Sequence, residues 1–152
     1  MKITKIMTDL LKLVDKKKIT SCAYGIQDNY IYFTPDGHRL FKIYDELFLI
    51  DLSKALSDKT PLNNPKRMFN VDKTEEAYKT NELKVVDGSK GTLVKIESEN
   101  SHAWINTDYL KDFDSECTFR ISNHREPVFI YELGEVVGLI LPVVTKEDLN
   151  ND

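Results

Sequence analysis

The most informative stretch of this sequence runs Ala103-Trp104-Ile105-Asn106-Thr107-Asp108-Tyr109-Leu110-Lys111-Asp112-Phe113. Branched and aromatic residues over 103–105 predict a short strand. Asn106 or Thr107 then supplies a side-chain oxygen that caps a helix over 107–113. Three further segments rich in branched and aromatic residues follow, at 117–122, 128–133 and 136–144. The C-terminal third therefore predicts one strand, a short helix and three more strands.

A predicted hairpin precedes this stretch. Its strands span 83–86 and 92–97, on either side of Asp87-Gly88-Ser89-Lys90-Gly91, where the two glycines accept positive φ angles. The residues of this turn are similar to those of a phosphate-binding loop. They lack the Gly-x-x-x-x-Gly-Lys-Ser/Thr spacing and a following helix, so we expect a turn here and no nucleotide site.

The N-terminal half begins with a helical pattern. Apolar residues over 3–14 recur at helical spacing, and polar positions that include Lys12 and Lys16 share the opposite face, which is net basic. An alternative starts the helix at Thr8, extends it over 8–17 and places a short strand over 1–6. Either pattern predicts one amphipathic helix at the start of the chain.

Four strand segments are predicted after this helix, at 21–26, 30–34, 40–44 and 47–51. Thr34-Pro35-Asp36-Gly37 is typical of a turn, because Pro35 fixes its own φ and Gly37 accepts a left-handed conformation. These segments are expected to form an antiparallel meander, closed by a helical turn over 52–56.

Two polar stretches set the expected domain organisation. Residues 57–81 combine Pro61 and Pro65 with many charges, which predicts a long connection with a short helix over 75–79 inside it. Residues 145–152 are polar and acidic and predict a flexible tail. We therefore expect a single domain over 1–144, with an insertion at about 57–81, followed by that tail.

The composition excludes several classes of protein. The chain has 152 residues, and its 21 Lys and Arg against 25 Asp and Glu give a formal net charge of −4. This balance creates no whole-molecule attraction to nucleic acid or acidic lipid, so DNA binding would need a local basic patch. Cys22 and Cys117 are expected as reduced, mostly buried thiols. No signal-peptide pattern or membrane-spanning run occurs, so we expect a cytoplasmic protein without membrane contact.

Signatures of catalytic chemistry are absent from the sequence. His38, His102 and His124 stand singly, without the helical partners typical of zinc ligands. No nucleophile elbow and no Cys-x-x-Cys pair occurs. We therefore expect no catalytic residue, no metal and no cofactor, and a protein that binds rather than an enzyme.

Three motifs of the C-terminal third follow one another in an order that can be compared with known families. A strand leads into Asn106-Thr107-Asp108-Tyr109-Leu110, Pro127-Val128-Phe129-Ile130 follows, and the chain reaches Gly138-Leu139-Ile140-Leu141-Pro142-Val143. Over residues 103–144 this pattern resembles the last half-domain of bacterial sliding clamps, the β-subunit family of polymerase processivity factors. The resemblance implies an α+β, clamp-like domain of curved antiparallel sheets with two short helices on one face.

The resemblance also implies contact residues. Basic helix faces line duplex DNA in clamps, which assigns DNA contacts in this chain to Lys12, Lys16, Lys17 and Lys111. The terminal strand of a clamp lines a pocket for short hydrophobic partner motifs, which assigns that pocket to Leu139, Leu141 and Pro142. The second helix departs from the family, because acidic residues surround Lys111. A clamp ring contains several such domains, so this chain would have to assemble with copies of itself to form one.

Three functions are open at this point. The first is a non-enzymatic clamp-like binding protein, from a bacterium or its phage, that acts on DNA-replication proteins or on DNA. The alternative is a small adaptor or inhibitor that acts by protein–protein contact through the 57–81 segment. The third is an enzyme with an unrecognised site around Asp36, His38 and Arg39.

Overall fold

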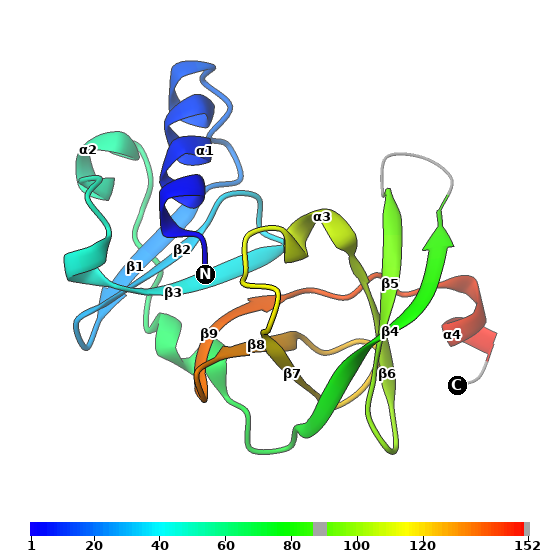
Figure 1. Cartoon of the computed structure of the whole chain (residues 1–152). Helices are drawn as coiled ribbons and strands as arrows, with labels where there is room; N and C mark the ends of the chain where they lie inside the picture. Colours follow the sequence, from blue (N-terminus) through cyan, green and yellow to red (C-terminus); the bar gives the residue numbers. More distant parts are fainter. Residues whose placement is uncertain (87–90, 151–152) are drawn as a thin grey trace. The chain divides into compact units, whose positions relative to one another are not determined.

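The computed structural model of the chain describes residues 1–86 and 91–150 (Figure 1). The chain divides into two compact units, Met1–Asn70 and Val71–Asp152. The strand pairs described within the units are antiparallel, and both units also contain helices. The predicted α+β class with antiparallel strands is confirmed. The boundary between the units falls within the predicted insertion at 57–81.

The first unit opens with helix α1, Ile3–Asp15, as the apolar periodicity predicts. Ile6 and Leu10 are its buried residues, and they lie one turn apart on the same face. Because the helix begins at Ile3, the alternative of a short strand over 1–6 is wrong. The helix also ends earlier than 17, since Lys17 has a positive φ of 53°.

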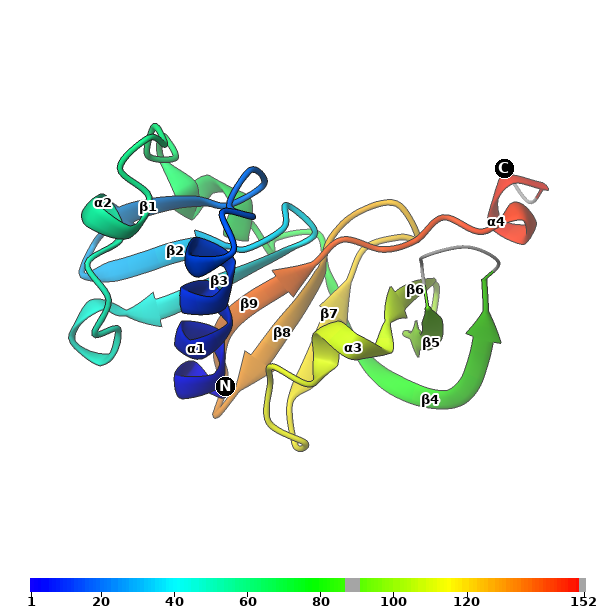
Figure 2. The same cartoon turned by 90° about the horizontal axis from the view of Figure 1, so that it is seen from above.

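The meander predicted after α1 is present in the first unit. It consists of β1 (Ala23–Gln27), β2 (Tyr30–Thr34) and β3 (Arg39–Tyr44). Asp28 and Asn29 both have positive φ and form the two-residue turn between β1 and β2. Helix α1 lies over one face of this sheet (Figures 1 and 2), and Phe33 is fully buried in its core.

The chain after β3 corrects the strand predicted over 47–51. A 3-10 helix, η1 (Asp45–Leu47), comes first, and the Phe48 N–H donates to Asp45 O at 3.1 Å. Because the Phe48 N–H is used in this turn, it cannot form a hydrogen bond in a sheet. The Asp51 carboxylate then caps α2 (Leu52–Ala55), which confirms the helical turn predicted over 52–56.

Residues 62–66 of the predicted connection pack along the outer edge of β1. The Leu62 N–H donates to Tyr24 O, and the 3-10 helix η2 (Pro65–Phe69) follows. Gly25 permits this approach, because a Cβ at that position would lie 2.9 Å from both Leu62 O and Pro65 Cγ. The segment therefore covers an edge strand.

The second unit is a six-stranded sheet in the order β9-β8-β7-β4-β5-β6. Its strands are β4 (Glu75–Val85), β5 (Thr92–Glu97), β6 (His102–Asn106), β7 (Thr118–Ile121), β8 (Val128–Glu132) and β9 (Glu135–Ile140). The sheet is strongly curved, as β4 shows in Figure 2. After β9, the Val143 N–H donates to Trp104 O in β6 at 2.7 Å. The curvature of the sheet therefore brings the chain that leaves β9, at one end of this strand order, to β6 at the other end.

Strand β4 corrects the short helix predicted over 75–79 and shortens the predicted connection. It is eleven residues long, and none of its side chains is fully buried. Apolar and polar residues do not alternate along it, so the usual strand signal is missing. The predicted hairpin with β5 is confirmed, with Leu83 opposite Val94. Of its predicted turn, residues 87–90 lie outside the described residues.

The order predicted for 103–144 is present as β6, α3 (Thr107–Leu110), β7, β8 and β9. The Asn106 side chain caps α3 by accepting the Asp108 N–H at 2.8 Å. The helix is a single turn that ends before Phe113, and β9 ends at Ile140 rather than at 144. Each unit thus contains one helix followed by a three-strand antiparallel meander, as α1-β1-β2-β3 and as α3-β7-β8-β9.

The predicted flexible tail is folded over its described part. Helix α4 spans Lys146–Asn150. The Thr145 N–H donates to Asp148 Oδ2 at 2.7 Å, and Asp148 Oδ1 lies 2.8 Å from His102 Nε2. Asp148 is buried, so a polar side chain anchors the segment where the sequence shows no apolar anchor.

Candidate protein-binding surface

A groove of about 520 Å³ lies between the end of β4 and the chain after β9. Residues 84–86 line one side of it, and residues 143–147 line the other. Each side contributes two valines. Lys84 Nζ lies 2.8 Å from Glu147 Oε2 and sits over the Trp104 ring at 5.5 Å from the centroid. The groove therefore combines apolar walls with a charged pair, which is typical of sites that bind short peptide segments.

Asp148 fixes the 143–147 wall of this groove. Burial alone would raise the pKa of Asp148, but the hydrogen bonds from the Thr145 N–H and from His102 outweigh it and hold the pKa below its usual value. The His102 ring also stacks on His124, with centroids 6.3 Å apart. An ionised Asp148 therefore ties the chain after β9 to β6 at neutral pH.

The residues predicted to line a partner pocket lead directly into the groove. Leu139 lies in β9 and is 6% exposed, so it belongs to the core. Leu141 is 39% exposed, and Pro142 is half-buried. The groove begins at Val143, the next residue. Partner contact by Leu139, Leu141 and Pro142 stays a prediction, and Val143 and Val144 extend their segment into the groove.

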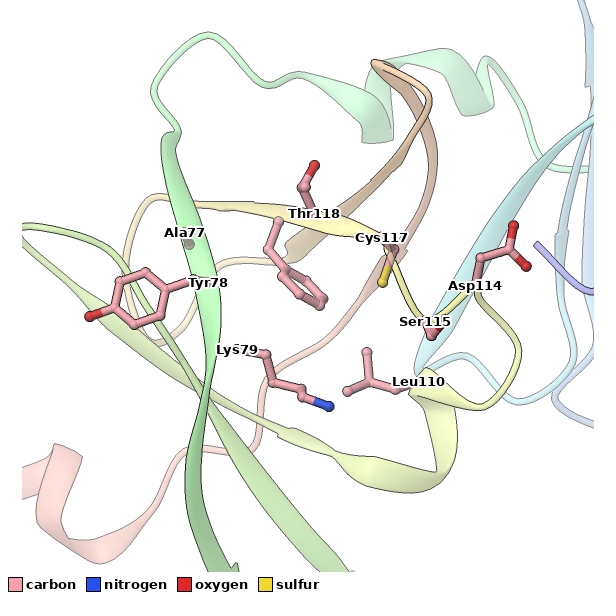
Figure 3. Close-up of a pocket in the computed structure, with 9 residues that line it drawn as sticks. Ala77, Tyr78, Lys79, Leu110, Asp114, Ser115, Cys117 and Thr118 are labelled. Atoms are coloured by element: carbon pink, nitrogen blue, oxygen red, sulfur yellow. The ribbon is translucent and has the colours of Figure 1, made fainter.

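A second pocket, of about 240 Å³, opens where β4 and β7 separate (Figure 3). The last pair between these strands is Ala77 opposite Phe119. Beyond it, Lys79 of β4 and Leu110 of α3 extend toward each other, and the Cys117 sulfur lies at the side of the pocket. Burial raises the pKa of the Cys117 thiol, so this sulfur is not an activated nucleophile.

The lysines predicted to contact DNA in the first unit are only partly available. Asp9 Oδ1 lies 3.4 Å from Lys12 Nζ, and Asp9 Oδ2 lies 3.0 Å from Lys5 Nζ. Burial would raise the pKa of Asp9, but these two lysines outweigh it and lower the pKa. Lys16 is the C-cap of α1, and Lys17 follows it. One carboxylate thus offsets charge in the centre of the basic face.

Lys111, the remaining predicted DNA contact, is the C-cap of α3. Its Nζ lies 2.5 Å from Asp108 Oδ1. Asp112 is buried next to it, and Asp114 follows two residues later. Helix α3 therefore presents no basic face, because its single lysine is paired and carboxylates surround it.

The three residues of the enzyme hypothesis, Asp36, His38 and Arg39, form part of a turn. Asp36 Oδ1 accepts the backbone N–H of His38 at 2.9 Å and that of Arg39 at 3.3 Å, and Asp36 Oδ2 lies 3.1 Å from Arg39 Nε. These bonds hold the connection between β2 and β3. They give all three residues a structural role, and the enzyme hypothesis gains no support from their geometry.

The segment of the adaptor hypothesis, 57–81, serves two structural purposes. Residues 62–66 cover β1, and residues 75–81 form the first part of β4. Removing residues 61–80 would therefore uncover one strand and delete part of another. Such a deletion would disturb folding as well as any recognition by this segment, and the adaptor hypothesis stays a prediction.

Metal-binding clusters, membrane-spanning helices and reactive cysteines are the remaining features to consider among the described residues. Among residues 1–86 and 91–150, His, Cys, Asp and Glu side chains form no group of three or more that could hold a metal ion. No helix in the same ranges is long and apolar enough to cross a membrane. Cys22 is buried, Cys117 is half-buried, and both are free thiols.

The groove and its anchor were missed by sequence reasoning. Thr145-Lys146-Glu147-Asp148 has the spacing of a capping box, in which the fourth residue accepts the N–H of the first. That motif predicts a helix start at Thr145 instead of a tail. The pairing of Asp148 with His102, 46 residues away, has no local signal.

The chain matches no protein-family model, and no curated protein sequence and no solved structure matches it significantly. Its functional interpretation therefore rests on its own contacts and on the sequence resemblance given above.

Proposed function

We propose that this chain is a non-enzymatic, clamp-like binding protein that acts on a protein of DNA replication. It captures a short apolar segment of that protein in the groove between residues 84–86 and 143–147. One observation carries the proposal: two of the groove's four valines, Val143 and Val144, directly follow Leu141 and Pro142, where the resemblance to sliding clamps implies a partner pocket.

The order of the elements supports the clamp-like part of the proposal. Strand, short helix and three strands follow one another over residues 103–144, in the order that the resemblance implies. A helix followed by a three-strand antiparallel meander also occurs in each unit. Such repetition is what two related half-domains would produce.

The charges favour a protein over duplex DNA as the partner. DNA binding gains affinity for each phosphate that a lysine or arginine neutralises. Asp9 offsets Lys5 and Lys12 on α1, and Lys111 on α3 is paired with Asp108. Exposed Lys16 and Lys17 at the end of α1 remain for phosphates, but α3 adds no basic face, whereas the groove offers apolar walls to a peptide.

Fluorescence anisotropy with labelled synthetic peptides tests the proposal. The probes are short peptides that carry two or three Leu, Phe or Met residues, and we expect a subset of them to bind. Val144→Asp should weaken their binding by about tenfold or more, because it buries a charge in an apolar wall. Leu141→Asp should weaken it as well. Leu149→Asp is the matched control, since Leu149 is exposed on α4 and does not line the groove.

The outcomes decide between the versions of the function. Failure of every peptide to bind, or equal effects of Val144→Asp and Leu149→Asp, would reject capture in this groove. Tight binding of duplex DNA that falls steeply with salt, and that Lys12→Glu and Lys16→Glu remove, would replace the protein partner with DNA.

A further inference from the structure

The second half of β4 has an open edge. On one side β4 pairs with β5 from Tyr78 to Val85, but on the other side it pairs with β7 only from Glu75 to Ala77. Among the described residues, no strand lies beside residues 78–85 on the side of β7. The backbone N–H and C=O groups that point to that side form a ready template for another strand.

The side chains of this edge are suited to contact. Leu83 is 65% exposed and Val85 is 79% exposed, and they lie on the same face because residues two apart in a strand do so. The register shift between Lys79 and Leu83 interrupts the strand before this point, so the regular part of the edge is short. A short edge with two exposed apolar residues favours a small, reversible contact over an extended one.

The sequence of the edge is complementary to itself. In a two-fold antiparallel pair of identical strands, one residue lies opposite its own copy. If the pair is centred on Glu82, the two Glu82 carboxylates face each other across the strands. If it is centred on Lys84, the two ammonium groups do. Both arrangements are unfavourable. Centring the pair on Leu83 opposes two leucines and places Glu82 opposite Lys84 in both directions. Among these three registers, the charges therefore favour the one centred on Leu83.

We propose that two copies of this chain associate through their β4 edges, antiparallel and centred on Leu83. The contact is isologous and closes at two copies, because each copy uses its open edge once. Glu82 and Lys84 carry the specificity of the register, and Leu83 and Val85 of both copies supply the apolar contact. The dimer does not rest on the peptide-binding function proposed above, although Lys84 and Val85 also line the groove.

The charges near the edge are compatible with this register. Glu82 Oε1 lies 3.4 Å from Lys95 Nζ, and Lys84 Nζ lies 2.8 Å from Glu147 Oε2. Both pairs lie on the face opposite Leu83 and Val85. A second copy would extend each pair into a longer row of alternating charge, without leaving a buried charge unpaired.

Sedimentation velocity of the full chain, from micromolar to millimolar concentration, tests the proposal. We expect a reversible monomer–dimer equilibrium. Glu82→Lys and Lys84→Glu each oppose like charges across the two-fold axis, and each should raise the dissociation constant about tenfold or more. Glu99→Lys is the matched control for Glu82→Lys, since it makes the same charge change at an exposed position outside β4, and it should leave the equilibrium unchanged.

Mixing the two charge variants makes the test decisive. In a one-to-one mixture of Glu82→Lys and Lys84→Glu, a mixed dimer again opposes unlike charges at both positions, so dimerisation should return. The double variant should also dimerise. Circular dichroism of each variant verifies folding, and a misfolded variant would not be rescued by mixing.

Three results would overturn the proposal: a chain that stays monomeric at millimolar concentration, a dimer insensitive to Glu82→Lys, or a mixture that stays monomeric while both variants are folded. Val144→Asp separates this surface from the groove, because it is expected to weaken peptide capture and to leave the dimer unchanged.

Discussion

Strands β2 and β4 each have a neighbouring strand on both sides, yet they differ in what they bury. Four of the five residues of β2 are buried, whereas β4 has no fully buried residue along eleven positions. The sequence predicts β2 at its observed bounds and assigns the first part of β4 to a connection and a helix. The difference teaches that sequence patterns detect the burial of a strand and not its hydrogen bonding.

The edges of the two regions differ in the same way. Residues 62–66 cover the outer edge of β1, with a bond from the Leu62 N–H to Tyr24 O. Along the second half of β4, no strand lies on the side of β7 among the described residues, although Leu110 of α3 approaches Lys79. A polar, proline-containing segment thus protects one edge, while the other edge has only its register shift and its charges for protection.

Replacing a buried residue of β2 should have the largest effect on stability. We expect Phe33→Ala to lower the free energy of unfolding by about 3–5 kcal/mol, because it removes a fully buried ring from the core. Chemical denaturation measures this change. Tyr78→Ala in β4 is the control and should cost less than about 1 kcal/mol, since Tyr78 is exposed. Similar costs at the two positions would contradict the contrast between the strands.

Lifting the cover from β1 should have an intermediate effect. Gly25→Ala places a Cβ within 2.9 Å of Leu62 O and Pro65 Cγ. We expect a loss of about 1–3 kcal/mol from this overpacking. Hydrogen exchange at the Leu62 amide should become faster, because its bond to Tyr24 O is strained. Unchanged exchange at Leu62 would show that residues 62–66 do not protect the edge.

Loosening α4 should have the smallest effect on the whole chain, because it acts locally. Asp148→Asn should lower the free energy of local opening over 145–149 by about 1–3 kcal/mol, because it removes a buried charged acceptor, and should change global unfolding little. The lowered pKa of Asp148 gives the pH dependence: the ionised carboxylate stabilises the fold above its unfolded pKa of ~3.9, and this contribution is lost as the pH falls through the lower folded value.

Hydrogen exchange over 145–149 as a function of pH measures this loosening. Glu147→Gln is the control, because that carboxylate is exposed and its pair with Lys84 should contribute little. Protection that is the same in Asp148→Asn and in the unmodified chain would show that Asp148 does not anchor α4.

The sequence predicts those parts of the fold in which local chemistry matches tertiary structure. The periodicity over 3–14 predicts α1, and Asn106 predicts the start of α3. The prediction of a strand over 47–51 is wrong, because Asp51 caps α2 and the Phe48 N–H closes a turn. The prediction of a flexible tail is wrong over its described part, because Asp148 is bound to His102, a residue far away in the sequence.

The groove could be located only in part from the sequence. Leu141 and Pro142 lie directly before its wall at 143–147, but the opposite wall at 84–86 comes from a strand with no alternation of apolar and polar residues. The groove depends on the curvature that brings Val143 to Trp104, and no local pattern encodes that contact. The predicted DNA lysines are present as residues, but their carboxylate neighbours are visible only in three dimensions.

The burial of the two native thiols has a practical consequence for spectroscopy. Burial raises the pKa of both Cys22 and Cys117, so both react slowly with maleimides near neutral pH. A single cysteine introduced at exposed Glu99 would therefore take a spin label selectively. Pulsed dipolar measurements between two labelled copies could then report their separation without first removing either native cysteine.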